Sequence, residues 1–150
     1  MNKTMKYLAL LTLSFIFTSS LSAADIWVTD YEKALETAKK EKKHLLLNFT
    51  GSDWCGWCIK LDKEVFDKSK FKKFAKKELV MVKLDFPNKK KQSKEEKEQN
   101  AKLAKEHGIR GYPTILILDS SGKVIGKTGY QKGGEKNYIK HIEDIIKKSK

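Results

Sequence analysis

The only two cysteines of the chain, Cys55 and Cys58, stand three positions apart in the stretch SDWCGWCIK. Trp54 precedes the pair, and Trp57 lies inside it. A cysteine pair at this spacing can carry out thiol–disulfide exchange, supply half of a metal site, or form a small structural disulfide.

A metal site is the least favoured of these three roles. A structural zinc ion needs four ligands, and the cysteine pair supplies only two. The histidines His44, His107 and His141 do not follow the spacing of a zinc-binding motif. A purely structural disulfide is also disfavoured, because it closes a loop of only a few residues and removes little entropy from the unfolded chain. Both alternatives stay open, and neither a metal nor a cofactor is expected.

Thiol–disulfide exchange explains more features of the local sequence than a metal site or a structural disulfide does. The pair follows the apolar run HLLLNFT and precedes a helical pattern, so Cys55 is expected at the N-terminus of a helix. Unpaired N–H groups at such an end stabilise a thiolate, which is the nucleophilic form of cysteine. Cys58 falls one turn later and is expected to be more shielded. We therefore predict that Cys55 attacks a substrate disulfide and that Cys58 resolves the mixed disulfide.

The residues beside the cysteines are expected to form a contact surface. Trp54 and Trp57 flank a pair that must face outward, so partial exposure is expected for both rings. Gly56 adds no side chain to the turn, so that the backbone of another protein can come close.

Residues 1–24 have the pattern of a secretory signal peptide. A basic start precedes the apolar run YLALLTLSFIF, and Ser22 and Ala24 occupy the small-residue positions of a cleavage site. An uncleaved membrane anchor is disfavoured, because a span needs about 20 apolar residues. The mature domain, 25–150, is therefore expected in the periplasm or secreted. Thiols there are not held reduced by the cytosolic systems, so the pair is expected to spend time as a disulfide.

The chain carries a formal net charge of +13, which raises the question of nucleic-acid binding. Arg110 is the only arginine, and the lysines are dispersed among glutamates rather than gathered in one tract. Because arginine is the main reader of phosphates and guanine edges, nucleic acid is not an expected partner. The charge indicates a lysine-rich solvated surface, with acidic partners or an anionic membrane surface as the weaker reading.

Helical and strand-like patterns alternate along the mature chain, which predicts one α/β domain around a single sheet. Asp30 is a plausible N-cap, and Gly108 a plausible C-terminal stop. The expected order is an edge strand IWV, a helix over DYEKALETAKKEKK, a strand HLLLNFT, helical pieces around 58–65 and 71–75, a strand LVMVKLDF, a helix AKLAKEHG, hairpin strands YPTILILD and KVIGKTG, and a helix EKNYIKHIEDIIKK.

Two segments of this order carry more specific expectations. The charged stretch 87–100 is expected to be an exposed loop whose last residues begin a helix, either as a docking surface or as a tolerated insertion. The final helix is expected to bury one stripe, made of Tyr138, Ile139, Ile142, Ile145 and Ile146.

The motif WCGWC after a buried strand, followed some fifty residues later by GYPT entering another strand, resembles the thioredoxin superfamily. The similarity covers about residues 26–148 and extends to exported bacterial proteins of the thiol:disulfide interchange type. It implies an α/β thioredoxin-like fold, a central mixed β-sheet flanked by helices. It also implies that Pro113 is the cis-proline of the family, and that Tyr112 before it offers backbone groups to the substrate.

The chain departs from thioredoxin in the groups around the cysteines. Asn48 stands where thioredoxin has a buried aspartate that moves the proton of the second cysteine. Proton transfer from Cys58 is then expected to use water or another group, such as Asp53 or Lys60, or to be slower. The dipeptide between the cysteines is Gly-Trp, without the histidine of strong oxidants, which favours the reducing or middle part of the family's range of potentials.

The sequence thus predicts an exported thiol–disulfide oxidoreductase that acts on cysteine-containing protein substrates through its CGWC pair, with reduction or isomerisation favoured over oxidation. Such a protein needs a membrane electron donor, or a membrane oxidant for the opposite direction. A monomer is favoured. The alternative is a redox-inactive binding module of the same fold, with a permanently closed disulfide.

Overall fold

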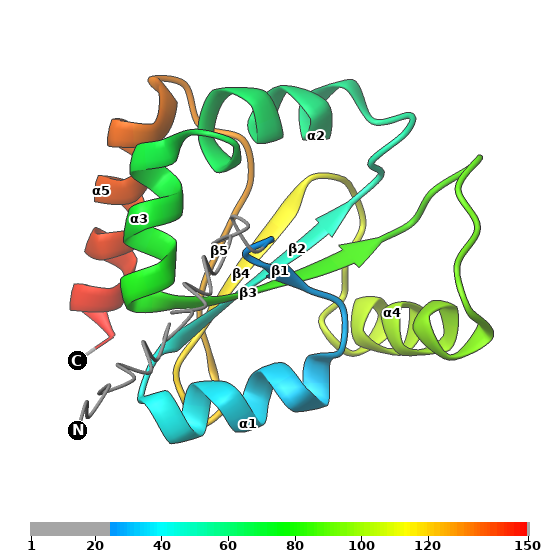
Figure 1. Cartoon of the computed structure of the whole chain (residues 1–150), viewed down its shortest axis with the longest axis horizontal. Coiled ribbons are helices and arrows are strands. Elements are labelled where there is room, and N and C mark those ends of the chain that lie inside the picture. The colour runs from blue at the N-terminus through cyan, green and yellow to red at the C-terminus, as the bar shows by residue number, and fades with distance from the viewer. Residues whose placement is uncertain (1–24, 150) are drawn as a thin grey trace, which may run out of the picture.

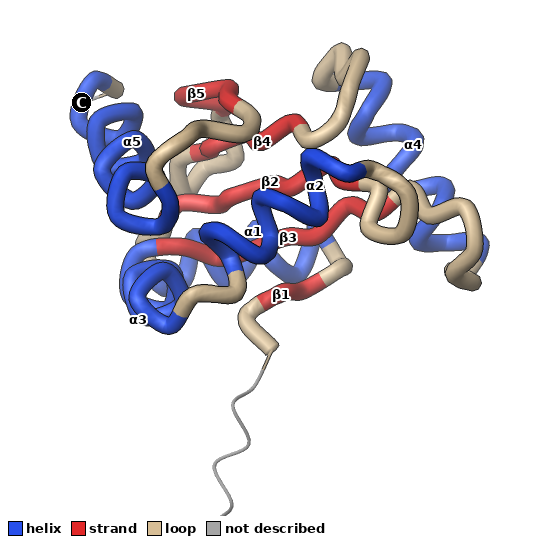
Figure 2. Tube along the Cα trace, turned by 90° about the horizontal axis from the view of Figure 1, so that it is seen from above, coloured by secondary structure: helices blue, strands red, loops and turns tan. Residues whose placement is uncertain are grey.

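The computed structural model describes residues 25–149, which contain one mixed five-stranded sheet. Its strands are β1 (Trp27–Val28), β2 (His44–Thr50), β3 (Leu79–Asp85), β4 (Thr114–Leu118) and β5 (Val124–Thr128). Figure 2 shows them side by side in the order β1-β3-β2-β4-β5. The first three strands are parallel, β4 is antiparallel to β2, and β5 forms the expected hairpin with β4.

Helices cover both faces of this sheet (Figure 1). They are α1 (Tyr31–Glu41), α2 (Gly56–Leu61), α3 (Ser69–Glu78), α4 (Lys94–Glu106) and α5 (Gly134–Lys148). One core lies between the sheet and the helices α1 and α4, and the other between the sheet and the helices α2, α3 and α5. This arrangement confirms the expected α/β class and the central mixed sheet flanked by helices. No helix within the described part of the chain is long and apolar enough to cross a membrane.

The strand β2 lies at the centre of the sheet, between β3 and β4. Its residues Leu45, Leu47 and Phe49 point into the core of α1 and α4, whereas Leu46 points into the opposite core. Because side chains alternate along a strand, a strand covered on both faces reads as a continuous apolar run. The predicted buried strand at 44–50 is therefore confirmed.

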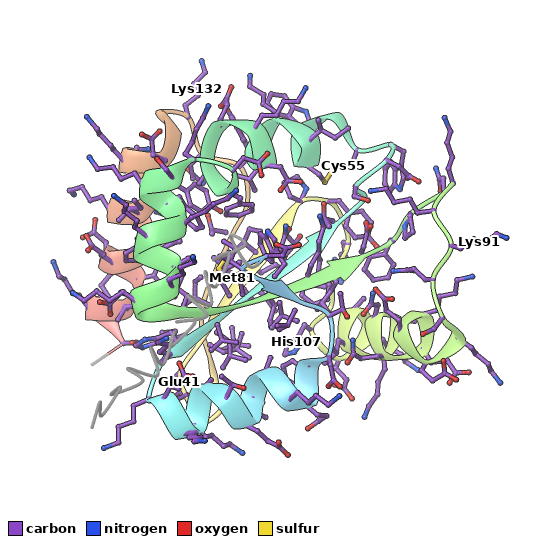
Figure 3. All side chains as sticks on the ribbon, in the orientation of Figure 1. Glu41, Cys55, Met81, Lys91, His107 and Lys132 are labelled. Carbon is purple, nitrogen blue, oxygen red and sulfur yellow. A yellow bond between two sulfur atoms is a disulfide. The ribbon has the colours of Figure 1, made fainter. Side chains whose placement is uncertain are left out.

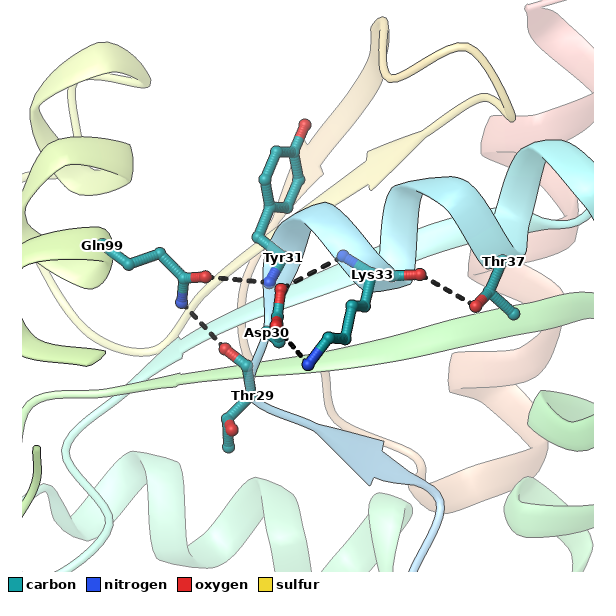
Figure 4. Close-up of polar contacts among 6 residues, drawn as sticks. All are labelled: Thr29, Asp30, Tyr31, Lys33, Thr37 and Gln99. Carbon is teal, nitrogen blue, oxygen red and sulfur yellow. Dashed lines mark hydrogen bonds and ion pairs between the residues drawn. The ribbon is translucent and has the colours of Figure 1, made fainter. Parts of the chain in front are cut away.

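A polar connection ties the start of α1 to α4 (Figure 4). The Asp30 carboxylate accepts a hydrogen bond from the Lys33 N–H at 3.1 Å and caps the helix as predicted. The Gln99 side chain accepts from the Tyr31 N–H at 2.9 Å and donates to the Thr29 carbonyl at 2.8 Å. These bonds fix the position of α4 relative to the sheet.

The prediction of an exposed loop over 87–100 is right only for its first half. The helix α4 already begins at Lys94, and the Ser93 hydroxyl caps it by accepting from the Glu96 N–H at 3.1 Å. A serine followed three residues later by a glutamate is a capping-box pattern, which the high charge of the segment obscured. The helix shows no apolar stripe in its first half, because Asn100 and Leu103 are its only buried residues.

The helix after the cysteines contains a feature that the sequence did not predict. The residues Asp62–Phe66, which continue α2, form a π-helical turn in which the Asp67 N–H donates to the Asp62 carbonyl at 2.8 Å. Such turns insert one extra residue and are frequent at functional sites. The expected stripe of α5 is confirmed, with Tyr138 and Ile142 fully buried and its other members half-buried against the same core.

Candidate redox site

Cys55 and Cys58 form a disulfide at the start of α2, beyond the carboxyl end of β2 (Figure 3). Cys55 is the N-cap residue, and its N–H donates to the Gly51 carbonyl at 2.9 Å. The Cys58 N–H donates to the Cys55 sulfur at 3.2 Å. The pair is largely covered, with 6 % of Cys55 and 1 % of Cys58 exposed.

This geometry makes the two sulfur atoms unequal. The Cys55 sulfur accepts a backbone N–H at the start of eleven consecutive helical residues, so a negative charge there is stabilised by that bond and by the helix end. Cys58 lies one turn inside the helix and is almost fully buried. Once the disulfide is reduced, the site can therefore hold a thiolate at Cys55 more easily than at Cys58.

The two tryptophans beside the pair are exposed, as predicted. Trp54 is 46 % and Trp57 is 59 % exposed. The Trp54 ring meets Tyr112 edge-on, with 5.7 Å between ring centroids, and its indole N–H donates to the Phe86 carbonyl at 2.7 Å. The Trp57 ring lies 5.1 Å from the Tyr130 ring. Each tryptophan ring thus contacts a tyrosine ring at the surface around the disulfide.

The segment before β4 reaches the same surface. The Tyr112–Pro113 peptide bond is cis. The Tyr112 ring lies between Trp54 and Phe86, 5.2 Å from the second ring, and its burial raises the pKa of its hydroxyl. A side chain at Gly56 would meet no atom within 4 Å, so the space in front of the helix start is open. Trp54 and Tyr112 are thereby brought together from segments that are far apart in the sequence.

Four polar side chains lie on one face of the sheet at the carboxyl ends of β2 and β3. Asn48 is paired in register with Lys83, and Thr50 with Asp85. Asn48 and Thr50 are fully buried, and neither the Asn48 Oδ1 nor the Thr50 Oγ1 has a hydrogen-bond partner. The Asp85 carboxylate accepts from the N–H and the hydroxyl of Ser52. We call Asn48, Thr50, Lys83 and Asp85 the polar end of the sheet.

Asp62 adds a carboxyl group to this region. It follows Cys58 by four residues along a helix, so both side chains lie on one helix face. Burial raises the pKa of the Asp62 carboxyl, the positive charge of Lys83 opposes the rise, and the charges of Asp67 and Asp85 add to it. Sequence analysis missed this residue, although its spacing from Cys58 was the available signal. Its carboxyl group lies one helical turn beyond the buried cysteine.

The two groups that the sequence suggested for proton transfer are engaged elsewhere. The exposed Asp53 carboxylate accepts from the backbone N–H groups of residues 88, 89 and 90, and the first of these bonds is the largest cause of its lowered pKa. The Lys60 ammonium lies 5.2 Å from the Trp57 ring centroid and 3.8 Å from the Glu64 carboxylate. Neither spacing nor charge revealed these partners, and a role of Asp53 or Lys60 in proton transfer stays a prediction. Within residues 25–149, no three histidine, cysteine or acidic side chains are grouped to hold a metal ion.

Residues 31–145 match the thioredoxin-like domain family. The chain belongs to this family. It is 36 % identical over 130 residues to the disulfide bond reductase DsbH of Chlamydia pneumoniae, covering 87 % of this chain and 78 % of that protein. A solved structure of a DsbH oxidoreductase superposes with a TM-score of 0.77 at 37 % identity, covering 81 % of this chain and 83 % of the other.

A second solved structure, a disulphide isomerase from Xylella fastidiosa, gives a TM-score of 0.60 at 26 % identity, covering 75 % of this chain and 88 % of the other. The thioredoxin-like fold expected from the sequence is confirmed. Family membership and the disulfide at the start of α2 make this thioredoxin-like protein a thiol–disulfide oxidoreductase.

Proposed function

We propose that this thioredoxin-like protein reduces disulfides in exported proteins, with Cys55 as nucleophile and Cys58 as resolving cysteine. The observation that carries the proposal is the position of the Cys55 sulfur, which caps a helix and accepts the Cys58 N–H. Similarity to a disulfide bond reductase over most of the chain favours the reducing direction. The Gly-Trp dipeptide, which contains no histidine to stabilise the thiolate further, favours the same direction.

The first step is attack of the Cys55 thiolate on one sulfur of a substrate disulfide. A new bond forms between Cys55 and that sulfur, the substrate disulfide breaks, and the other substrate sulfur leaves as a thiolate. In the second step the Cys58 sulfur attacks Cys55 and releases the second substrate thiolate. The substrate gains two electrons, and the protein ends as the disulfide seen in the structure.

The second step requires Cys58 to lose its proton in a buried position. Asp62 is the carboxyl group one turn further along the helix, and the buried Asn48 cannot take a proton. We assign proton acceptance from Cys58 to Asp62. Burial raises its pKa toward that of a thiol, which makes the carboxylate a better base than an exposed aspartate.

The surface around the disulfide is assigned to substrate contact. Trp54 and Trp57 provide exposed rings on either side, and Gly56 leaves the helix start open. Tyr112 and Pro113 present the backbone before β4, which is the segment that the family resemblance assigns to the substrate strand. An incoming peptide would thus lie between the aromatic residues and the cis-proline segment.

Export is part of this proposal. The signal peptide expected at 1–24 lies outside the described residues, and cleavage after Ala24 would leave the thioredoxin-like domain in the periplasm or secreted. There the oxidised pair must receive two electrons for each turnover, so a membrane electron donor is the expected partner. N-terminal sequencing of the exported protein tests the cleavage position.

Insulin reduction tests the proposed reaction. With dithiothreitol as the source of electrons, the protein is expected to precipitate insulin chains catalytically, Cys55→Ala to fall to the background rate, and Cys58→Ala to accumulate mixed disulfides. Equilibration with glutathione is expected to give a potential between about −270 and −180 mV, the range from thioredoxin to protein disulfide isomerase. A value near −120 mV would overturn the reducing direction. No turnover, together with a disulfide that resists dithiothreitol, would instead identify a redox-inactive binding module.

A further inference from the structure

A groove of about 390 Å³ lies beside the redox site, between the segment 86–93 and α4. The reaction proposed above makes no use of its outer wall. The residues that matter here are Trp54, Phe86, Pro87, Lys97, Ala101 and Tyr112. Its volume is in the range of sites that hold small ligands or a few side chains.

The redox motif itself anchors the segment that forms this outer wall. The Asp53 carboxylate, two residues before Cys55, accepts from the N–H groups of residues 88, 89 and 90 at 2.9, 2.7 and 3.1 Å. Three backbone donors on one carboxylate fix the turn of the segment relative to the cysteine pair. A merely tolerated insertion would not need such an anchor.

The inner end of the segment is fixed as well. The Asp85 carbonyl accepts from the Gln92 side chain at 3.1 Å and from the Asn100 side chain at 3.0 Å. Asn100 is fully buried on α4, so the segment and the helix are joined through one buried carbonyl. The groove is therefore a preformed feature with a fixed shape.

The groove is continuous with the proposed substrate surface. Trp54 precedes Cys55, Tyr112 precedes Pro113, and both rings line the groove. Phe86 extends this aromatic wall, because its ring contacts Tyr112 and its carbonyl accepts the Trp54 indole N–H. A polypeptide that presents a disulfide to Cys55 can place a neighbouring side chain in the groove without leaving this surface.

Lysines form one side of the rim of the groove: Lys97 lines the groove, and Lys89 and Lys91 belong to the segment 86–93 that forms its outer wall. Within the described residues, no carboxylate forms an ion pair with Lys89, Lys91 or Lys97. Figure 3 shows Lys91 extending from the segment away from the body of the protein. Three carboxylates near the segment already accept hydrogen bonds: Asp53 and Asp85 from backbone N–H groups, and Glu96 from the Gln92 side chain at 3.1 Å. These carboxylates are thus engaged in hydrogen bonds, whereas the three lysines have no ion pair within the described residues and can meet a partner's carboxylates.

We infer that this groove receives an apolar side chain from a stretch of the substrate rich in aspartate and glutamate, while a neighbouring cysteine of that substrate reaches Cys55. The apolar walls accept the side chain, and the lysines attract the flanking carboxylates. This inference rests on the proposed function for the identity of the occupant. It assigns to the segment 86–93 the role of selecting acidic substrates.

Binding of cysteine-free peptides to the oxidised protein tests the groove separately from thiol chemistry. The probe is a short fluorescein-labelled peptide with one leucine among aspartates and glutamates, and serine in place of cysteine. It is expected to bind about tenfold more tightly than a peptide with lysines in place of the acids, with the difference shrinking at high salt. A third peptide, with alanine in place of leucine, is expected to bind more weakly than the probe.

Three variants localise this binding. Lys91→Glu/Lys97→Glu is expected to weaken the acidic peptide about tenfold, and Ala101→Trp to weaken it by filling the groove from an exposed helix position. Lys73→Glu is the control for charge reversal, because Lys73 is exposed on α3, away from α4 (Figure 1). The control is expected to bind like the unmodified protein.

Kinetics connect this binding to the reaction. The reduced variants are expected to reduce hydroxyethyl disulfide, a small neutral compound, at the unmodified rate. The double variant and Ala101→Trp are expected to lose the preference for the cysteine-containing acidic peptide, offered as its mixed disulfide with glutathione. Intact reduction of the small disulfide without any preference among peptides would overturn the inference and leave the proposed function standing.

Two further outcomes of these experiments distinguish the groove from the proposed function. Binding of the acidic peptide without reduction of any disulfide would support the groove and overturn the proposed function. Lysine-dependent binding to vesicles that contain phosphatidylglycerol, with no binding of the acidic peptide, would show that the rim faces a membrane and would overturn the inference.

Discussion

The two faces of β2 and β3 differ in how their buried side chains change along the strands. On the face toward α1 and α4, Leu45, Leu47 and Phe49 of β2 are apolar to the end, and so are the corresponding residues of β3. On the face toward α2, Leu46 is followed by Asn48 and Thr50. β3 repeats this change in register, with Met81 followed by Lys83 and Asp85.

The difference separates stability from chemistry on a single sheet. Buried polar groups without partners destabilise a fold, so a sheet selected for stability alone would continue the apolar pattern on both faces. In β2 and β3 the buried polar residues Asn48, Thr50 and Asp85 lie at the carboxyl ends of the strands, on the face that carries α2 and the cysteines. The apolar face stabilises the sheet, and the polar end surrounds the place where the proposed mechanism transfers a proton from Cys58 to Asp62.

The largest effect is expected from the apolar face. Leu47→Ala removes a fully buried side chain and is expected to lower the free energy of unfolding by about 2–5 kcal/mol. The rate of insulin reduction per folded molecule is expected to stay unchanged, because Leu47 points away from α2. Urea unfolding and the insulin assay, performed on the same sample, measure both quantities.

Leu46→Ala is the matched control, since Leu46 is equally buried but packs on the face of α2. It is expected to lower stability by a similar amount and also to change the rate, because it loosens the packing beneath the helix that carries the cysteines. Equal effects of both variants on the rate would show that the two faces do not divide stability from chemistry.

An intermediate effect is expected at Asp62. Asp62→Asn is expected to slow the release of the mixed disulfide at neutral pH about tenfold or more, because the amide cannot accept the Cys58 proton. In the unmodified protein the release rate is expected to rise with pH as the Asp62 carboxyl ionises above its raised pKa. Stopped-flow measurement with a chromogenic mixed disulfide follows this step. Asp67→Asn, which removes an exposed carboxylate nearby, is expected to leave the release rate almost unchanged.

The same raised pKa predicts how stability depends on pH. The folded protein binds the Asp62 proton more tightly than the unfolded chain, whose pKa lies near the ordinary value of 3.8. This contribution to stability is therefore complete below about pH 3.8 and is lost as the pH rises through the folded value. Asp62→Asn is expected to lack this loss. Urea unfolding of both proteins from acid to neutral pH checks the difference, and parallel curves would contradict it.

The apolar face could be predicted from the sequence almost completely. The run HLLLNFT gave the bounds of β2, because a doubly covered strand needs apolar side chains on both faces. Family resemblance likewise identified Tyr112 and Pro113 as part of the substrate surface, but it did not predict the contact between the Trp54 and Tyr112 rings.

The surroundings of the cysteines could not be predicted in the same way. Asp62, Lys83 and Asp85 come from two segments, and only strand register and a π-helical turn bring them to one face. The partners of Asp53 and Lys60 were missed for the same reason, since Asp53 accepts from the backbone N–H groups of residues 88–90 and Lys60 lies against Glu64 and the Trp57 ring. Local pattern predicts elements, whereas polar partners depend on tertiary structure.

The smallest effects are expected from two threonines, one on each face. Thr50 is fully buried on the polar face, and its hydroxyl has no partner. Thr114 lies on the opposite face, and its hydroxyl donates to the Gly111 carbonyl at 2.7 Å.

Thr50→Val is expected to raise the free energy of unfolding by about 1 kcal/mol, because it removes a buried group that forms no hydrogen bond. Thr114→Val is expected to lower it by about 1 kcal/mol, because the same change breaks a hydrogen bond. Urea unfolding of both variants gives the signs. A loss of stability at Thr50 equal to that at Thr114 would mean that the polar end of the sheet is as well paired as the rest of the core.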